Sequence, residues 1–328
     1  MDPRHAFFSR IEETIKQLVN RKNRNPQKPV KQHFVPTSYQ ARFRGDDGKF
    51  CVYLLRAKRI YSSDPGRVGY SNDLYTLPDE QGCPDYQVEH FFSVVEEKSA
   101  PAIEKLLRDE DLTEEERFWI CFFWGAAFCR SRDIIRSYQA LFGDLQTRAF
   151  RHKYSSLEET RRWLAAEPAK YKDITAEELY EYVHSDEYDI AYESHSVLPS
   201  LLRLMPHICQ ILWESRITVL HAPEGKSFVT GDNSVVLMSF REFGKTGFGL
   251  PDTAKVMPLS WRVCLVADGL GEGFRRFTAD SEMVRNINLR IAADAQEFII
   301  GRSQALIASL VEATGARHRT WTSSFSVS

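Results

Sequence analysis

Apolar and charged positions alternate with a helical period at the start of the chain. The apolar positions lie three or four residues apart: Phe7, Phe8, Ile11, Ile15, Leu18 and Val19. This spacing predicts an amphipathic helix. A cationic segment containing prolines follows over 21–31, and we expect the helix to stop there. Residues 1–30 are therefore predicted to be an N-terminal amphipathic helix and a basic leader, which is either a solvated linker or a phosphate-binding arm.

Helical periodicity dominates the middle of the chain, and strand-like runs follow it. Helices are predicted over 88–97, 101–108, 113–142, 155–182 and 197–213. Thr113 and Glu116 fit a capping box at the start of the third of these helices. Short β-branched and aromatic runs come next: 216–220, 227–230, 234–238 and 261–266. One long final helix is predicted over 281–310.

Strand signals also occur before the helical segment. The β-rich run 50–55 follows the pair Asp47-Gly48, which predicts a hairpin. Strands on both sides of the helices predict an α+β fold. We expect a mixed or antiparallel sheet built from early and late strands, with a large helical insertion at about 88–215. Residues 31–328 are expected to form a single domain.

Composition adds limits rather than a function. Apolar residues are 43% and charged residues 27% of the chain, as in soluble globular proteins. The net charge of −2 gives no global reason to expect a polyanionic partner. The six cysteines are scattered without a C-x-x-C pair, which favours reduced thiols in a cytosolic protein. The longest apolar stretch, 119–129, is too short to span a bilayer, so we expect a cytoplasmic protein without a membrane segment.

Several short motifs occur in order along the chain. They are Gln32-His33-Phe34-Val35-Pro36, Glu89-His90-Phe91-Phe92, Arg130, Phe228-Val229-Thr230-Gly231-Asp232-Asn233, Pro258-Leu259-Ser260 and Asn288. By this ordered set the chain resembles the bacterial and fungal DUF4238 family over about residues 31–300. Gly231 and Ser234 replace the serine and the proline of the family's late turn, which changes the rigidity of the backbone there. The resemblance implies an intracellular protein and assigns no activity.

His33 and Asp232 are the candidate catalytic residues. An imidazole acts as a general acid, a general base or a metal ligand near neutral pH. Alternatively, the ring caps a backbone group while Phe34 and Val35 anchor a strand. Asp232 lies beside Asn233, a candidate substrate-binding residue, and such a pair suits a divalent metal or orients a histidine. The same residues are equally ordinary in a turn.

Arg130 is the candidate anion ligand, because a guanidinium binds phosphate or carboxylate through two hydrogen bonds. It lies at a helix end, where it would equally favour the helix dipole. Asn288, in the last predicted helix, is a further candidate substrate-binding residue. Glu89 and Glu96 lie two helical turns apart, as paired carboxylates or as ordinary surface glutamates. The acidic run 184–195 is interpreted as a solvated surface rather than a metal site.

The leading hypothesis is an intracellular enzyme that acts on a phosphate-containing substrate, a nucleic acid or a nucleotide, in a defence or toxin context. A metal-dependent hydrolase or nuclease fits, with a divalent metal as its cofactor. The alternative is a non-catalytic sensor or adaptor that binds a protein or nucleic-acid partner. Convergence of the candidate residues in one open pocket would favour the enzyme. Dispersal, or burial with satisfied hydrogen bonds, would favour the adaptor. The sequence leaves the oligomeric state open.

Overall fold

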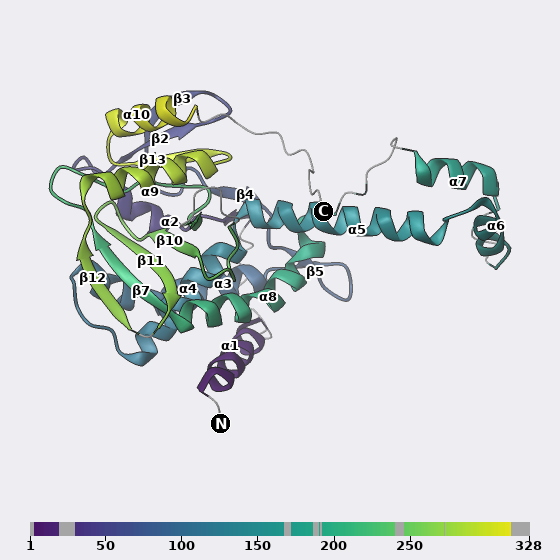
Figure 1. Cartoon of the computed structure of the whole chain (residues 1–328), viewed down its shortest axis with the longest axis horizontal. Coiled ribbons are helices and arrows are strands. Elements are labelled where there is room, and N and C mark those ends of the chain that lie inside the picture. Colours follow the sequence, from purple (N-terminus) through teal and green to yellow (C-terminus); the bar gives the residue numbers. More distant parts are fainter. Residues whose placement is uncertain are drawn as a thin grey trace.

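The computed structural model describes residues 3–19, 30–166, 172–185, 190, 192–239, 246–271 and 273–315. These form a body of sheets and helices, from which a helical arm projects (Figure 1). The helices are α1 (Pro3–Val19), α2 (Thr37–Gln40), η1 (Ala41–Phe43), α3 (Gln87–Leu107), α4 (Glu114–Cys129), α5 (Arg132–Lys153), α6 (Leu157–Ala166), α7 (Ala176–His184), α8 (Ser194–Glu214), α9 (Ser281–Asp294) and α10 (Gln304–Thr314). The strands are β1 (Lys31–His33), β2 (Phe50–Leu54), β3 (Arg59–Ser63), β4 (Tyr70–Asn72), β5 (Leu77–Pro78), β6 (Pro84–Asp85), β7 (Ser215–His221), β8 (Thr230–Gly231), β9 (Val236–Ser239), β10 (Thr253–Pro258), β11 (Val263–Leu270), β12 (Phe274–Thr278) and β13 (Phe298–Gly301).

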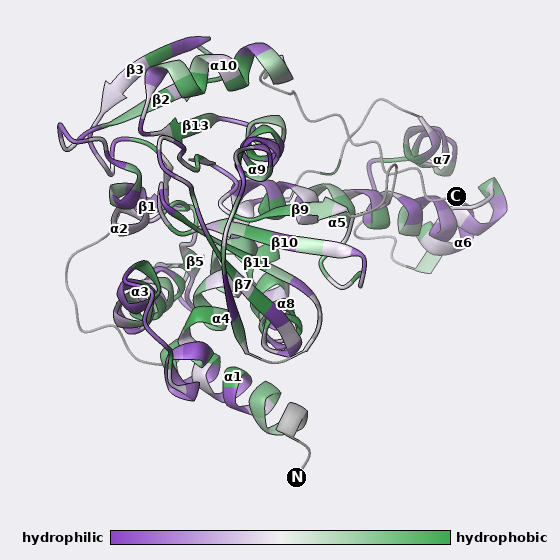
Figure 2. Ribbon diagram, turned by 60° about the vertical axis from the view of Figure 1, so that its left-hand side comes forward, coloured by the Kyte–Doolittle hydropathy of each residue, from purple (hydrophilic) through white to green (hydrophobic). Residues whose placement is uncertain are grey.

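A five-stranded sheet lies at the centre of the body, in the order β12-β7-β11-β10-β9. Its strands are antiparallel except for β12 and β7, which run parallel. Alternate side chains of a strand point to opposite faces. Ile217, Val219 and Leu265 therefore pack into one core cluster with α4 and α8, whereas Leu220 and Val256 pack into another with α9. The sheet thus lies between α9 on one face and α4 and α8 on the other (Figure 2).

A four-stranded sheet, β3-β2-β13-β8, joins the early and late parts of the chain. β13 pairs antiparallel with both β2 and β8, and Phe298 lies opposite Leu54. The predicted α+β fold, with strands contributed from both ends of the sequence, is confirmed. The predicted hairpin at Asp47-Gly48 is wrong, because that turn precedes β2 and the hairpin joins β2 to β3.

The single final helix predicted over 281–310 is wrong, because β13 separates α9 from α10. The run Phe298-Ile299-Ile300 is buried and paired on both sides, so strand pairing prevails over the helical tendency of the neighbouring alanines. Asp280 and Ser303 cap the two helices separately through their side-chain oxygens.

The single helix predicted over 113–142 consists of two helices. α4 begins at the predicted capping box, in which Thr113 and Glu116 exchange side-chain and backbone hydrogen bonds. It ends before Ser131, whose hydroxyl caps the start of α5. The second helix, α5, also continues past the predicted end at residue 142 to Lys153. The turn at Ser131 therefore redirects the chain from the body into the arm.

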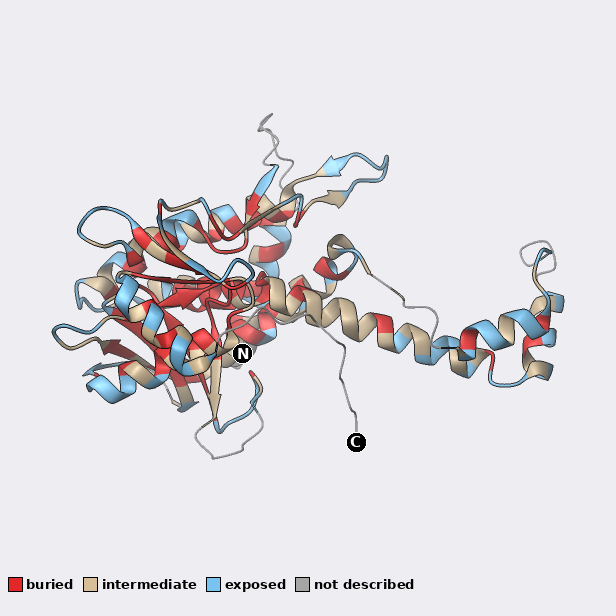
Figure 3. Cartoon of the chain, turned by 90° about the horizontal axis from the view of Figure 1, so that it is seen from above, coloured by how far each residue is buried: buried red, intermediate tan, exposed pale blue. Residues whose placement is uncertain are grey.

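α1 packs on the body through aromatic contacts, since Phe7 stacks on Trp213 of α8 with ring centroids 4.4 Å apart. Most of the basic leader that follows α1 lies outside the described residues. α5 extends from the body to the right in Figure 1 and carries α6 and α7. The arm is mostly half-buried or exposed, whereas buried residues concentrate in the body (Figure 3). No helix in the described part of the chain is long and apolar enough to cross a membrane.

Candidate functional site

His33 joins two segments of backbone. Its Nε2 lies 3.2 Å from the carbonyl oxygen of Gly66, and its ring centroid lies 5.5 Å from that of Tyr70 in β4. The imidazole thus connects β1 to the loop that leads into β4, which is the backbone-capping role considered as the alternative from the sequence.

Asp232 follows β8 and is 2% exposed. Its Oδ1 accepts hydrogen bonds of 3.1 Å from the N–H groups of Gln296 and Phe298, and its Oδ2 accepts one of 3.0 Å from Gln296. Burial raises the pKa of Asp232 to about 6, although the backbone hydrogen bonds oppose that rise. The carboxylate therefore connects the turn after β8 to the segment that leads into β13.

The two candidate asparagines also bind backbone groups. The side-chain amide of Asn233 donates a hydrogen bond of 3.0 Å to the carbonyl oxygen of the last residue of α9. Asn288 accepts one of 3.0 Å from Val229 N–H and donates one of 2.9 Å to the carbonyl oxygen of Ser227. Asp232 and both asparagines thus lie around one turn, where they hold it against α9 and β13.

Arg130 follows α4, and its side chain is 3% exposed. Its Nη1 donates a hydrogen bond of 2.8 Å to Glu96, and its guanidinium carbon lies 5.3 Å from the centre of the Phe92 ring. Its Nε and Nη2 are closed to solvent and have no hydrogen-bond partner among the described residues. Burial raises the pKa of Glu89 to about 7, and the Arg130 charge opposes that rise. Arg130 and the two glutamates therefore form a closed charge cluster rather than an open pocket.

A separate set of residues lines an open cavity of about 560 Å³. Its basic residues are Arg42, Arg44, Arg108, His221 and Arg262. Its carboxylates are those of Glu104 and Asp109, and Trp261 contributes an aromatic wall. We call it the Trp261 cavity. Its volume lies within the roughly 300–1,000 Å³ of small-molecule sites, and its lining is predominantly cationic.

Two segments that carry the family resemblance build the base of the Trp261 cavity. Tyr39 donates its hydroxyl hydrogen bond to the carbonyl oxygen of Pro258 at 2.5 Å, and Trp261 N–H donates to the carbonyl oxygen of Arg42 at 3.2 Å. The Arg42 side chain is only 13% exposed and contacts Glu104 at 3.5 Å. Burial lowers the pKa of Arg42 below its ordinary value. The Arg42 guanidinium thus lines the cavity with the Glu104 carboxylate beside it.

Two further arginines contact the face of Trp261. The guanidinium carbons of Arg262 and Arg302 lie 5.3 and 4.1 Å from its ring centroid. Trp261 and Arg262 also line an adjoining cavity of about 830 Å³. Neither Arg44 nor Arg262 has an ion-pair partner within the described ranges. The charges of these two arginines are therefore available to a ligand.

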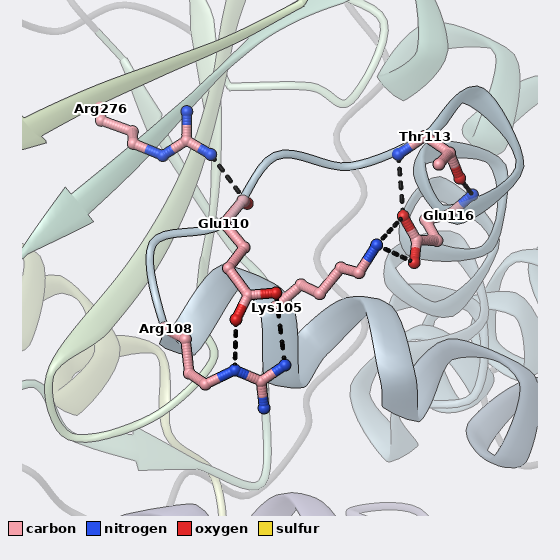
Figure 4. A network of polar contacts seen from close by, with 6 residues as sticks. All are labelled: Lys105, Arg108, Glu110, Thr113, Glu116 and Arg276. Carbon is pink, nitrogen blue, oxygen red and sulfur yellow. Dashed lines mark hydrogen bonds and ion pairs between the residues drawn. The ribbon is translucent and has the colours of Figure 1, made fainter.

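The turn between α3 and α4 forms another wall of the Trp261 cavity. Arg108 donates hydrogen bonds of 2.5 and 3.4 Å to the Glu110 carboxylate (Figure 4). Arg276 of β12 donates a hydrogen bond of 2.8 Å to the carbonyl oxygen of Glu110. Arg276 also contacts the carboxylates of Asp109 and Asp111 at 2.7 and 2.9 Å. Asp109 has a φ of 65°, in the left-handed region that aspartate tolerates better than most residues. Arg276 therefore fixes the Asp109 carboxylate.

His221 is the last residue of β7 and lines the cavity together with Asp109. Its Nε2 is closed to solvent and lies 3.3 Å from Asp109 Oδ1, without an aligned hydrogen bond. Its Nδ1 has no hydrogen-bond partner in the described part of the chain and is not closed to solvent. One ring nitrogen therefore faces a carboxylate and the other stays open, which is an arrangement that can transfer protons.

Three other cavities are less suited to anions. The adjoining cavity of about 830 Å³ balances three cations with three carboxylates. A cavity of about 360 Å³ at the start of α5 and α8 contains Arg132 and Arg136, but both bind Glu297, at 2.8 and 3.1 Å. An apolar cavity of about 270 Å³ on the five-stranded sheet has Asp268 and no cation. Among these four cavities of the described structure, arginines and lysines outnumber carboxylates in the Trp261 cavity alone.

No group of three or more histidine, cysteine or acidic side chains suited to a metal ion occurs among the described residues. The Asp232 carboxylate and the Asn233 amide are already bound to backbone groups. Part of the acidic run 184–195, namely 186–189 and 191, lies outside the described residues. A divalent metal therefore stays a prediction of the sequence.

No sequence pattern pointed to the whole Trp261 cavity, because its residues come from four distant segments. Arg42 lies shortly after the first family motif, and Trp261 directly follows Pro258-Leu259-Ser260. Their nearness to these motifs is the feature of the sequence that could have pointed to them. Asp109 and His221 carried no such signal, since each lies at the end of an ordinary element and only the fold brings them together.

The comparisons with known proteins agree with the order of the motifs. The family model described as "Protein of unknown function (DUF4238)" matches residues 31–305. Neither a curated protein nor a solved structure matches the chain.

Proposed function

This chain belongs to the DUF4238 family, and we propose that it binds a phosphate-containing substrate, a nucleic acid or a nucleotide, in the Trp261 cavity. The proposal rests on one observation, namely that four arginines and a histidine line a cavity that contains two carboxylates. Guanidinium groups bind phosphate oxygens through paired, charge-assisted hydrogen bonds. A bound phosphate would add the negative charge that this lining lacks.

Trp261 supports a ligand with a base as well as a phosphate. Proteins that bind single-stranded nucleic acid combine cationic grooves with aromatic side chains. The Trp261 cavity adjoins a second cavity at Trp261 and Arg262, so a ligand of several nucleotides can extend from one to the other. Lys226 also lines that second cavity, whereas Arg302 there is paired with Asp46.

Binding is tested by fluorescence anisotropy with a labelled oligothymidylate, and by thermal shift with adenosine monophosphate and inorganic phosphate. The variant Arg44→Gln/Arg262→Gln removes two cations that have no ion-pair partner in the described residues. We expect its Kd to rise about a hundredfold or more, because two charged contacts are lost and each is worth roughly 1.5–3 kcal/mol. The slope of log K against log salt should fall by about 1–2.

Arg148→Gln is the matched control, since Arg148 lies on the arm and pairs with Asp144. It should bind like the wild type. Arg136→Gln tests the competing cavity at the start of α5. Loss of binding in that variant, with full binding in Arg44→Gln/Arg262→Gln, would move the site and contradict the proposal.

A non-catalytic adaptor is the second candidate, and the arm favours it. Leu145, Phe150, Trp163 and Tyr182 are 36–52% exposed, and all four lie on the arm. Exposed apolar side chains grouped on a projecting element suit a protein partner. If a protein partner binds the Arg44→Gln/Arg262→Gln variant but not the Trp163→Glu variant, that result would support the adaptor role over ligand binding in the cavity.

A further inference from the structure

We propose that His221 is the acid–base residue of a phosphoester hydrolysis in the Trp261 cavity. The inference rests on the proposed binding of a phosphate-containing substrate there. Nε2 of His221 lies 3.3 Å from Asp109 Oδ1, and Nδ1 is open and unpartnered in the described structure. The imidazole lines the same cavity as Arg42, Arg108 and Arg262. A proton-transfer group and the cations that attract phosphate thus occur in one place.

Asp109 is the positioning residue for this histidine. A carboxylate beside Nε2 favours the tautomer with the proton on Nε2, so that Nδ1 is left as the acceptor. Arg276 holds that carboxylate through the contact of 2.7 Å with Asp109 Oδ1 and also anchors the neighbouring Glu110 carbonyl oxygen. The left-handed backbone of Asp109 ends α3, where Glu110 N–H donates a hydrogen bond of 2.9 Å to the carbonyl oxygen of Lys105, so the helix end fixes the position of Asp109.

The step balances with water as the co-reactant. Nδ1 of His221 takes a proton from the water molecule as its oxygen forms a bond to phosphorus. The bond from phosphorus to the leaving oxygen breaks, and its electron pair stays on that oxygen. The leaving oxygen then takes the proton from His221, which returns to its neutral form. The arginines stabilise the charge that develops on the remaining phosphoryl oxygens.

Hydrolysis is assayed with p-nitrophenyl phosphate, bis(p-nitrophenyl) phosphate and labelled single-stranded oligonucleotides. Acid–base groups contribute about 10²–10⁴-fold to rate, so His221→Asn should lower kcat by that factor while the Kd for oligothymidylate stays within about threefold. Asp109→Asn, which also tolerates the left-handed backbone, should lower kcat more than it changes KM. His195→Asn, in the cavity beside Arg132 and Arg136, is the matched control and should keep wild-type activity.

Binding and hydrolysis fail in distinguishable ways. If the wild type binds oligothymidylate but cleaves none of the three substrates, or if His221→Asn cleaves like the wild type, the hydrolysis is overturned and the binding stands. If the wild type binds none of the phosphate probes, the proposed function itself fails. Should His221→Asn fold poorly by circular dichroism, His221→Gln and Asp109→Asn provide the same comparison. Full activity in both would equally overturn the role of His221.

Discussion

At the residue scale, Glu89 is expected to make stability depend on pH. Its pKa of about 7 lies above the ordinary 4.5, so the folded protein holds a proton that the unfolded chain releases. The free energy of unfolding should therefore fall as pH rises through the folded pKa, by roughly 1 kcal/mol between about pH 6 and 7.5. Asp232, with a pKa of about 6, lowers the free energy of unfolding further as pH rises, mainly below about pH 6.

Urea unfolding at both pH values measures this fall. Glu89→Gln should remove most of this fall, because the amide does not titrate and Asp232 contributes mainly at lower pH. Glu97→Gln, on the exposed side of the same helix, should leave it unchanged. An undiminished fall in Glu89→Gln would place the responsible proton on another group.

Sequence patterns identified polar residues that make specific hydrogen bonds. They did not show whether these side chains bind a substrate or the backbone groups of a neighbouring segment. Asp232 and Asn288 were predicted at a site, and each binds buried N–H groups of a neighbouring segment. A carboxylate or amide that satisfies backbone donors leaves the same pattern as one that binds a ligand. The difference lies in what faces the side chain across the fold, and residues distant in sequence decide that.

At the scale of elements, α4 and α8 approach each other at Gly125. A Cβ at this position would lie 2.5 Å from the Sγ of Cys209, so the glycine is required by packing. Gly125→Ala is expected to lower the free energy of unfolding by about 1–3 kcal/mol through overpacking. Helix propensity alone would raise it by up to about 1 kcal/mol, so the two effects differ in sign.

The matched control is Gly249→Ala, because a Cβ there meets only Ile211 at 3.8 Å. Its free energy of unfolding, measured in urea, should stay within about 0.5 kcal/mol of the wild type. A Gly125→Ala protein as stable as the wild type would contradict the close approach of the two helices.

Element ends were predictable where a side chain marks them, as at the capping box of Thr113. They were not predictable where tertiary pairing decides. The strand β13 was assigned to a helix, because its partners β2 and β8 lie far away in the sequence. Local periodicity contains no information on such pairing.

At the scale of the whole molecule, a net charge of −2 conceals a local concentration of arginine. The fold brings η1, the turn after α3, the end of β7 and the turn before β11 to one cavity. No stretch of sequence contains that arrangement, so composition could not predict it. The arm projects from the body (Figure 3), and its exposed apolar residues form a second surface apart from this cavity.

Hydrogen exchange of backbone amides, with and without saturating oligothymidylate, tests the central claim most directly. Binding in the Trp261 cavity predicts slower exchange in the segments 41–44, 104–109, 221–222 and 260–263, which line it. Slower exchange confined to 132–139 and 193–195, or no change in any segment, would contradict the account.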